Sequence, residues 1–315
     1  MKRKLLLIVN PHAGRAAIKN HVMDIIDVFV KEDFVVTCFT TQKQGDPERI
    51  VEECGADFDR IVCCGGDGTV NEGLNGIMRL KKKPELGIIP VGVMNDYAYN
   101  LAIPSNPKIA AEIAAGDCVF TIDVGELNGK FFTYAAAFGL FTDVTYQTNQ
   151  DMKNILGVVA YGLEGLKRIA DIKTYHVTVE HDGGIIEGDY MIGLFSNSIS
   201  IAGVRTAYTD ALLDDGLLEI ALIKKPASLE EMQEIVNVLL SIKKATDVES
   251  GFLTILHTKS VKITCDEPVA WTVDGECGGV FTESDIRAHQ QAIKVLAGHD
   301  MSKNSIATEQ DTPLF

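Results

Sequence analysis

Short apolar runs alternate with amphipathic helical patterns along the first part of the chain, and this rhythm restricts the fold more than any other feature of the sequence. We expect strands at 5–9, 34–39, 60–64 and 86–90, with helices at 22–30, 46–54 and 69–80 between them. Strands that follow one another through helices are joined by crossover connections and lie parallel in one sheet. Such a sheet carries helices on both faces. The alternation therefore predicts a doubly wound α/β domain at the N-terminus.

The rest of the chain has a different pattern. From about Phe120, β-rich segments are separated by glycine and aspartate turns, which indicates antiparallel strands. These strands are expected at 131–138, 175–181, 187–195, 217–223, 261–265 and 269–273. One helix at 228–243 interrupts them, with Ser228 as its N-cap and two glutamates in its first turn. Because 315 residues exceed what a single hydrophobic core usually supports, we expect two domains.

The formal net charge of −15 argues against nucleic acid as a partner, because binding to a phosphate backbone needs a surplus of Lys and Arg. No apolar stretch approaches the roughly 20 residues that span a bilayer, and the run at 5–9 is too short for the core of a secretory signal. We therefore expect a cytoplasmic protein whose membrane contact is peripheral.

The seven cysteines include no CxxC pair, so reduced thiols are expected. Cys63 and Cys64 are neighbours on an expected strand, and their side chains therefore point to opposite faces of the sheet. We expect both thiols to pack in the core and not to bind zinc.

The segment Gly65-Gly66-Asp67-Gly68-Thr69 lies where the strand at 60–64 passes into a helix. Glycines at such a turn let backbone N–H groups approach phosphate oxygens, and the N-terminus of the helix adds partial positive charge. Asp67 lies in the same turn and can position a Mg²⁺ ion that bridges phosphates. A tight turn would explain one or two of these residues but not the whole series. The segment therefore indicates a phosphate-binding loop.

Two further turns are expected beside this loop, because the carboxyl ends of parallel strands meet at one edge of an open sheet. The first is the turn at 10–15, which contains Gly14 and offers Arg15 as a phosphate partner. The second is Gly92-Val93-Met94-Asn95-Asp96, which follows the strand at 86–90. Either turn alone would be ordinary turn chemistry.

Several short motifs together carry a family resemblance. The segment from Gly65 to Asn71 is followed by Glu72, Asn75 and Gly76. The other motifs are Asn10, Pro11 and Gly14; Asn95 and Asp96; Ser196, Asn197 and Ser198; Leu213, Asp214, Asp215 and Gly216; and Asp274, Gly275 and Glu276. The first segment is similar to the GGDGTxNE and NG signature of the diacylglycerol kinase catalytic family, and the other motifs appear in the family's order. The chain thus resembles this family, especially its soluble bacterial lipid kinases, along nearly its whole length up to the tail.

The resemblance implies a fold of the class α/β plus all-β. It has an N-terminal doubly wound α/β nucleotide-binding domain at 1–122 and a C-terminal antiparallel β-sandwich at 123–289 for the lipid substrate. The last strands, near 290–298, are implied to return to the first domain. Composition predicts that the tail at 300–315 is disordered.

The resemblance also implies the site residues, with ATP and Mg²⁺ as cofactors. Glu276 would be the catalytic base, because the lipid hydroxyl must lose its proton as it attacks the γ-phosphate, and Asp67 would act near the phosphates. Asp215 matches a structural Mg²⁺ site that the backbone carbonyls of Leu212 and Leu217 complete. The ATP site would consist of Asn10, Pro11, His12, Ala13, Gly14, Arg15, Thr41, Gly65, Gly66, Asp67, Gly68, Thr69, Val70, Asn71, Val93, Asn95 and Asp96.

Without the resemblance, the last two of these motifs would be turns. Asp214-Asp215-Gly216 reads as a simple turn, and Asp274-Gly275-Glu276 reads as a hairpin, since Asp-Gly favours type I′ geometry.

Three positions depart from the family's pattern. Val93 replaces a threonine, Ala13 stands where a serine is common, and Tyr99 stands where an arginine often follows the Asn-Asp pair. Each change removes on the order of one hydrogen bond from nucleotide binding. A catalytically silent lipid-binding relative therefore stays open as an alternative, although the retained carboxylates favour an active enzyme.

The predicted function is transfer of the γ-phosphate of ATP to the hydroxyl of a lipid, with diacylglycerol as the first candidate and phosphatidic acid as its product. The sequence does not identify the lipid, so sphingoid bases and other glycerolipids stay open. An NAD kinase, which has a similar GGDGT loop, is a further alternative. We expect the enzyme to visit the membrane surface transiently, and an exposed edge strand in the second domain would allow a homodimer.

Overall fold

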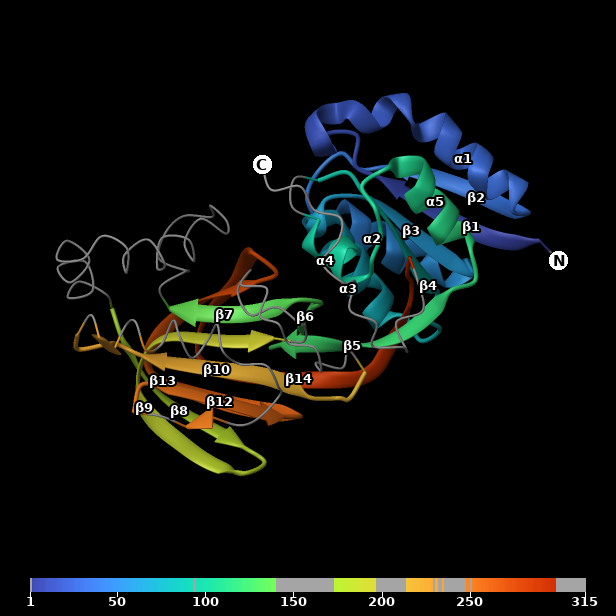
Figure 1. The fold of residues 1–315 in the computed structure, drawn as a ribbon. Helices are drawn as coiled ribbons and strands as arrows, with labels where there is room; N and C mark the ends of the chain where they lie inside the picture. The colour runs from blue at the N-terminus through green and yellow to red at the C-terminus, as the bar shows by residue number, and fades with distance from the viewer. Residues whose placement is uncertain are drawn as a thin grey trace.

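The computed structural model describes residues 2–92, 95–139, 173–196, 214–228, 230, 231, 234, 248, 249 and 251–298. One part of the molecule is a parallel sheet covered by helices, and the other consists of long antiparallel strands (Figure 1).

The strands of the first part lie parallel in the order β2-β1-β3-β4. They are β1 (Arg3–Val9), β2 (Phe34–Thr40), β3 (Arg60–Gly65) and β4 (Glu85–Pro90). The helices are η1 (Ala13–Asn20), α1 (Val22–Lys31), α2 (Asp46–Cys54), η2 (Gly55–Asp57), α3 (Asp67–Arg79), α4 (Asp96–Asn100) and α5 (Pro107–Ala115). α1 and α5 cover one face of the sheet, and α2 and α3 cover the other (Figure 1). The chain reverses direction across the sheet between β1 and β3, which is the switch point where open α/β sheets bind ligands.

The predicted strands and helices of this part are all present. α3 begins at Asp67, two residues earlier than expected, because the extended Gly66 is its N-cap. α5 was not predicted, although Asn106 before Pro107 is a helix-start signal, and the Asn106 side chain accepts hydrogen bonds from two backbone N–H groups of the first turn. Among the described residues, no helix is long and apolar enough to cross a membrane.

The parallel strands are buried on both faces, as their continuous apolar runs indicate. Cys63 and Cys64 on β3 are fully buried, and burial raises the pKa of each thiol to about 12. Thiols in this state stay protonated and unreactive. The expectation that both pack in the core is confirmed.

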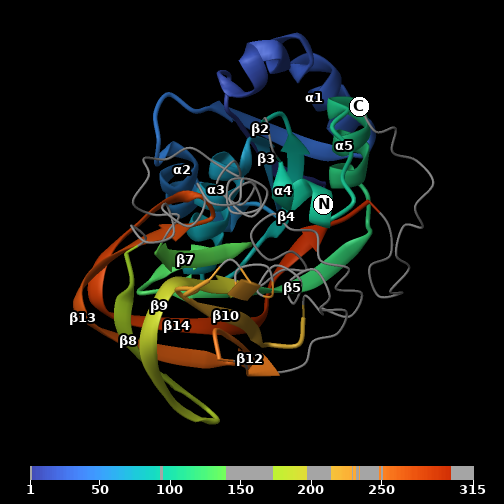
Figure 2. The same cartoon turned by 60° about the vertical axis from the view of Figure 1, so that its left-hand side comes forward.

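The second part consists of β5 (Val119–Leu127), β6 (Lys130–Phe132), β7 (Ala135–Gly139), β8 (Tyr175–His181), β9 (Gly184–Ser196), β10 (Leu218–Lys224), β11 (Val248–Glu249), β12 (Leu253–Thr258), β13 (Ser260–Val273) and β14 (Glu276–Leu296). β7 and β8 each pair with both β9 and β13, so these four strands close a ring. β9 and β13 curve strongly to reach both neighbours (Figure 2). The ring encloses an apolar core that contains Phe138, Phe195 and Trp271.

β14 joins the two parts of the molecule. Its first residues pair with β13, its middle and end pair with β5, and Val295 pairs in parallel with Leu86 of β4. The strand thus runs from the antiparallel part into the parallel sheet (Figure 1), and the described strands form one connected sheet of 14 strands.

Two expected segments differ in the structure. The strand at 131–138 is broken at Thr133 and Tyr134, because their backbone N–H groups donate to the carboxylate of Asp274 and not to a neighbouring strand. The strands at 261–265 and 269–273 are one strand, β13, whose register shifts between Thr264 and Val269.

Other expected features fall partly outside the described residues. Ser228 accepts a hydrogen bond from Glu231 N at 3.1 Å, as an N-cap does, but most of the helix at 228–243 lies outside the described residues. Asn197, Ser198, Leu213 and the tail at 300–315 lie outside them as well.

Candidate functional site

A cavity of about 470 Å³ lies at the carboxyl ends of the parallel strands, at the switch point between β1 and β3. It is lined by Asn10, His12, Ala13, Gly14, Thr41, Gln42, Lys43, Gln44, Pro47, Gly66, Gly68, Thr69, Glu72, Gly92 and Glu276. Nine of these residues were expected in the ATP site or as the catalytic base. The turns after β1, β3 and β4 were expected to meet here, and all three contribute residues to the cavity wall.

The glycine loop needs glycines because the neighbouring chain approaches it closely. A Cβ atom on Gly65 would lie 2.3 Å from the hydroxyl oxygen of Thr69, and one on Gly92 would lie 2.6 Å from the Cα atom of Gly66. α3 begins directly after Gly66 and has 13 residues. The first N–H groups of a helix have no partner within it and carry partial positive charge. The loop therefore presents an anion-binding helix start to the cavity.

The turn after β1 is fixed against the same loop. The Asn10 side-chain amide donates to the hydroxyl of Thr69 at 3.3 Å, and its oxygen accepts from the backbone N–H of His12 at 3.0 Å. Gly14 has φ +55°, and a Cβ atom there would lie 2.0 Å from the carbonyl oxygen of Val91. Only glycine fits this position. The backbone of Arg15 continues in η1, but its side chain lies outside the described part of the chain.

Asp67 holds the third turn in place. Its carboxylate accepts hydrogen bonds from the backbone N–H groups of Asn95 at 2.9 Å and Tyr97 at 3.4 Å. Asn95 adopts φ +55°, and its amide exchanges two hydrogen bonds with the backbone of Gly92. Asp67 thus connects the glycine loop to the start of α4. The side chain of Asp96 and the whole of Val93 lie outside the described residues.

Glu276 reaches the cavity from the antiparallel part. It follows the turn of Asp274 and Gly275, whose φ values of +47° and +81° are those of the type I′ hairpin that the sequence predicts. One carboxylate oxygen lies so close to Gly68 that a Cβ atom on this glycine would be 2.5 Å away from it. The other accepts a hydrogen bond from the amide of Gln44 at 3.3 Å. The carboxylate therefore lies beside the helix start of α3.

Asp274 fixes the hairpin that carries Glu276. Its carboxylate accepts bonds from the backbone N–H groups of Thr133, Tyr134 and Ala135, from the Thr133 hydroxyl and from the Asn71 amide, all at 2.7–3.0 Å. Burial raises the pKa of Asp274, and the hydrogen bonds from Thr133, Ala135, Tyr134 and Asn71 oppose that shift. Asn71 thus serves the hairpin, and Val70 is buried in the core; neither is among the residues that line the cavity.

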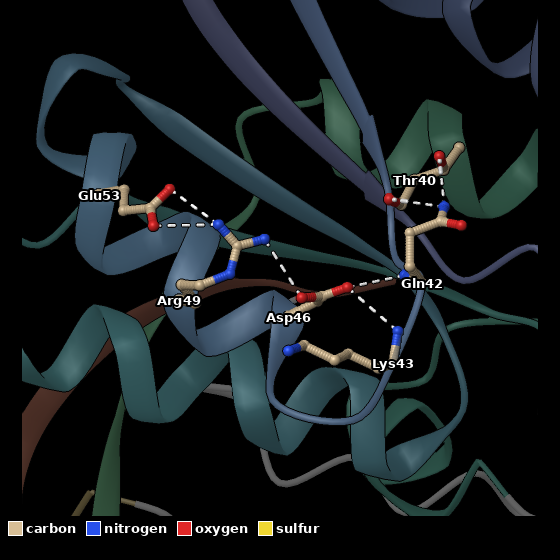
Figure 3. Close-up of polar contacts among 6 residues, drawn as sticks. All are labelled: Thr40, Gln42, Lys43, Asp46, Arg49 and Glu53. Atoms are coloured by element: carbon tan, nitrogen blue, oxygen red, sulfur yellow. Dashed lines mark hydrogen bonds and ion pairs between the residues drawn. The ribbon is translucent and has the colours of Figure 1, made fainter.

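In the segment after β2, Thr41 was expected in the ATP site, but the sequence did not point to Gln42, Lys43, Gln44 and Pro47, which also line the cavity. The carboxylate of Asp46 accepts bonds from the backbone N–H groups of Gln42 at 2.7 Å and Lys43 at 3.1 Å (Figure 3). The Gln42 N–H holds the pKa of Asp46 below its usual range, with Lys43 N–H and Arg49 acting in the same direction and burial opposing them. In the sequence, an aspartate just before Pro47 indicates only the opening of a helix.

Glu72, in the second turn of α3, adds a second carboxylate to the cavity. Burial raises its pKa, and the charges of Glu276, Glu48 and Asp46 act in the same direction, whereas the backbone N–H of Gly45 opposes the shift. This clustering of acids leaves the cavity with negative charge that a bound cation would neutralise.

The acidic turn at Asp214 and Asp215 lies directly before β10 and is not among the residues that line the cavity. The Asp215 carboxylate accepts a bond from the backbone N–H of Leu217 at 2.9 Å. Burial raises the pKa of Asp215, an effect opposed by the Leu217 N–H and by His257. Nearby Asp123 accepts bonds from the backbone N–H groups of Gly216 and Gln291. Leu212 lies outside the described residues. Among the residues that the structure describes, no group of three His, Cys, Asp or Glu side chains could hold a metal ion.

Comparison with known proteins identifies two matching families. The diacylglycerol kinase catalytic domain matches residues 4–127, and the YegS C-terminal NAD kinase beta sandwich-like domain matches residues 136–297. The diacylglycerol kinase of Bacillus subtilis (strain 168) is 32% identical over 298 residues, which cover 93% of this chain and 96% of that protein. The diacylglycerol kinase of Staphylococcus carnosus (strain TM300) is 29% identical over 315 residues, covering 99% and 100%.

A solved structure gives the same result for the fold. The crystal structure of a diacylglycerol kinase from Bacillus anthracis str. Sterne has a TM-score of 0.72 at 24% identity and covers 94% of this chain and 97% of that chain. The predicted fold class, an α/β part followed by an antiparallel β-sandwich, is thereby confirmed. The motifs, the fold and the relatives agree, and the chain belongs to the diacylglycerol kinase catalytic family.

Proposed function

We propose that this lipid kinase transfers the γ-phosphate of ATP to the hydroxyl of diacylglycerol, giving phosphatidic acid and ADP. The observation that carries the proposal is the position of Glu276, whose carboxylate lies against Gly68 at the start of α3 in the same cavity as the glycine loop. Phosphoryl transfer to an alcohol needs a group that binds the phosphates and a group that accepts the proton of the alcohol. The helix start can provide the first, and the carboxylate beside it can provide the second. The names of the relatives suggest the lipid class.

ATP is proposed to bind in the cavity with its phosphates at the N-terminus of α3. Asn10, Gly14 and Thr41 line that cavity together with the glycine loop. Asn95 would act indirectly, because its hydrogen bonds with Gly92 and Asp67 hold the two loops together. Preorganised backbone N–H groups stabilise the charge that develops on a transferring phosphate.

Mg²⁺ fits the charges at this cavity. ATP brings several negative charges to a site that already contains the carboxylates of Glu72 and Glu276. Mg²⁺ bound with nucleotides typically takes one or two carboxylates plus phosphate oxygens and waters, so a complete cage of protein ligands is not required. Glu72 and Asp67 are the residues proposed to hold it. When bound, the ion would supply positive charge that neutralises the phosphates.

The proposed reaction is a single displacement. The oxygen of the lipid hydroxyl forms a bond to the γ-phosphorus, and its proton passes to the carboxylate of Glu276. The bond between the γ-phosphorus and the bridging oxygen breaks, and ADP leaves with that oxygen. The placement of Glu276 beside Gly68 supports its role as the base.

A structural Mg²⁺ ion is proposed at Asp215, with backbone carbonyls of Leu212 and Leu217. The surrounding charges favour a cation there: the charges of Asp215 and Asp214 add to burial in raising the pKa of Asp123. Buried Glu219 has its pKa raised to about 7, first by burial and then by the charge of Asp215. Such an ion would stabilise the turn and is assigned no step of the reaction.

In this proposal, residues 1–122 bind ATP and residues 123–289 bind the lipid, as in the expected domains. The pairing of Val295 with Leu86 supports the return of the last strand to the first domain.

Diacylglycerol is a membrane lipid, so the enzyme is proposed to bind the membrane surface transiently during turnover. A homodimer through an edge strand of the second part is a further proposal, and sedimentation equilibrium tests it.

The test is transfer of labelled γ-phosphate from ATP to diacylglycerol in mixed micelles with Mg²⁺. Glu276→Ala and Asp67→Ala are expected to abolish transfer, whereas Glu112→Ala, an exposed carboxylate on α5, is expected to retain it. Transfer only to a sphingoid base or another glycerolipid would correct the acceptor. Formation of NADP from NAD would replace the proposal by an NAD kinase. Lipid binding without Mg-ATP binding at millimolar nucleotide would identify a silent relative.

A further inference from the structure

The two carboxylate oxygens of Glu276 have different surroundings. Oε2 accepts a hydrogen bond from Nε2 of Gln44 at 3.3 Å. Oε1 faces Gly68, at the helix start that is proposed to bind the phosphates. Both contacts come from the α/β part, whereas Glu276 itself belongs to β14. One oxygen is therefore engaged by an amide, and the other is directed to the place where phosphoryl transfer would occur.

Gln44 can orient another residue because the loop that carries it is itself fixed. Asp46 accepts bonds from the backbone N–H groups of Gln42 and Lys43, and Arg49 in turn bonds Asp46 at 3.2 Å and Glu53 at 2.9–3.0 Å (Figure 3). These contacts tie the loop to α2. A side chain that projects from such an anchored loop loses little further freedom when it makes a contact.

The same loop also faces α3. The backbone N–H of Gly45 opposes the rise in the pKa of Glu72, which lines the cavity together with Gln44. The loop is thus tied to α2 and lies against α3. This arrangement joins one wall of the proposed ATP site directly to the proposed base.

We infer that Gln44 is a positioning residue that holds Oε2 of Glu276, so that Oε1 is the oxygen that takes the proton of the lipid hydroxyl. The inference rests on the proposed function, because it needs Glu276 to act as the base. The hydrogen bond from Gln44 keeps the carboxylate from rotating away from the helix start.

Gln44→Ala tests the inference, and Gln42→Ala is the matched control. Gln42 is in the same loop and lines the same cavity, but its amide donates to the Thr40 carbonyl and hydroxyl (Figure 3). For Gln44→Ala we expect kcat to fall about 3- to 10-fold and the KM for ATP to stay within about twofold. Any effect of Gln42→Ala is expected in the KM for ATP, because its amide does not contact Glu276. An unchanged kcat in Gln44→Ala, or a change confined to KM, would overturn the inference.

A measurement without catalysis separates this inference from the proposed function. In the protein labelled with ¹⁵N-glutamine, the side-chain amide resonance of Gln44, assigned by its loss in Gln44→Ala, is expected to shift in Glu276→Ala, which removes its acceptor. The resonance should keep its position in Glu112→Ala. A resonance that does not shift in Glu276→Ala would overturn the contact even where phosphate transfer occurs. A resonance that shifts in a protein without kinase activity would confirm the contact but overturn the proposed function, and with it the role of Gln44.

Discussion

The two parts of the molecule contribute very unequally to the cavity. The α/β part supplies turns from the ends of all four of its parallel strands, whereas Glu276 is the one residue of the antiparallel part among the described residues that line it. The first contribution includes four glycines and the start of α3, which suit the binding of phosphates. The second is a single carboxylate. Mutation can therefore separate the nucleotide binding proposed for one part from the chemistry proposed for the other.

The largest expected effect is on chemistry alone. Glu276→Gln keeps the size and the hydrogen-bonding capacity of the side chain but removes the proposed base, so kcat is expected to fall by about 10²- to 10⁴-fold. The affinity for ATP should stay within about threefold, because the nucleotide is proposed to bind to the other part. Calorimetry with a non-hydrolysable ATP analogue, alongside the transfer assay, measures both. Loss of nucleotide binding in parallel with activity would contradict the separation of the two parts.

Asp274→Ala should affect the junction between the parts. The substitution leaves the backbone N–H groups of Thr133, Tyr134 and Ala135 without their acceptor, in a partly buried place. The expected cost is about 2–4 kcal/mol of unfolding free energy, with a lower kcat because the hairpin of Glu276 loosens. Urea denaturation measures the first effect. Asp182→Ala, in an exposed hairpin of the same part, is the control and should cost much less. Equal stability of the two variants would show that the network does not hold the junction.

Gly14→Ala and Gly45→Ala compare two left-handed glycines within the α/β part. A Cβ atom on Gly14 meets the Val91 carbonyl oxygen, whereas one on Gly45, at φ +83°, has no atom within 4 Å. Gly14→Ala is expected to cost about 2–3 kcal/mol and to weaken ATP binding, because the turn must move. Gly45→Ala should cost about 1 kcal/mol from backbone strain alone. Similar losses in thermal denaturation would mean that the packing of the turn on Val91 contributes little.

The smallest effect is expected on the surface of the antiparallel part. His176 on β8 contacts Asp189 at 2.9 Å and Glu187 at 3.2 Å, and the hydrogen bond to Asp189 is the main reason that its pKa is raised above 6.5. The stabilisation is therefore complete below about pH 6.5 and is lost as pH rises through the raised pKa. His176→Ala should lower the Tm by about 1–2 °C at pH 5.5 and leave it unchanged at pH 9. ATP binding should not respond; a response would connect this surface to the cavity.

The elements whose chemistry is local could be predicted from the sequence. A strand, a run of glycines and a helix start are consecutive in the chain, so the glycine loop at Gly65–Thr69 is recognisable from residue order alone. The Asp-Gly hairpin could be predicted for the same reason. The parallel strands were recognisable because strands buried on both faces are continuously apolar.

Contacts between distant residues were not accessible in this way. Gln44 and Glu276 are 232 positions apart, and nothing in the segment 42–45 marks it as part of a site. The break at Thr133 and Tyr134 also escaped prediction, because it depends on a carboxylate that the chain supplies 141 positions after Thr133. Local propensity favours a continuous strand there, and a tertiary hydrogen-bond network overrides it.

The path of β14 restricts how the molecule can fold and open. The strand begins at Glu276 and ends beside β4, so neither part has its complete set of strands until the last stretch of the described chain is in place. During synthesis, the earlier strands are therefore released before β14 can pair with them. Each part expressed alone would expose an unpaired strand edge. The two parts should therefore unfold in one cooperative transition. Rotation of one part away from the other would break the hydrogen bonds of the shared strand β14, so a substrate would have to enter through movements of loops.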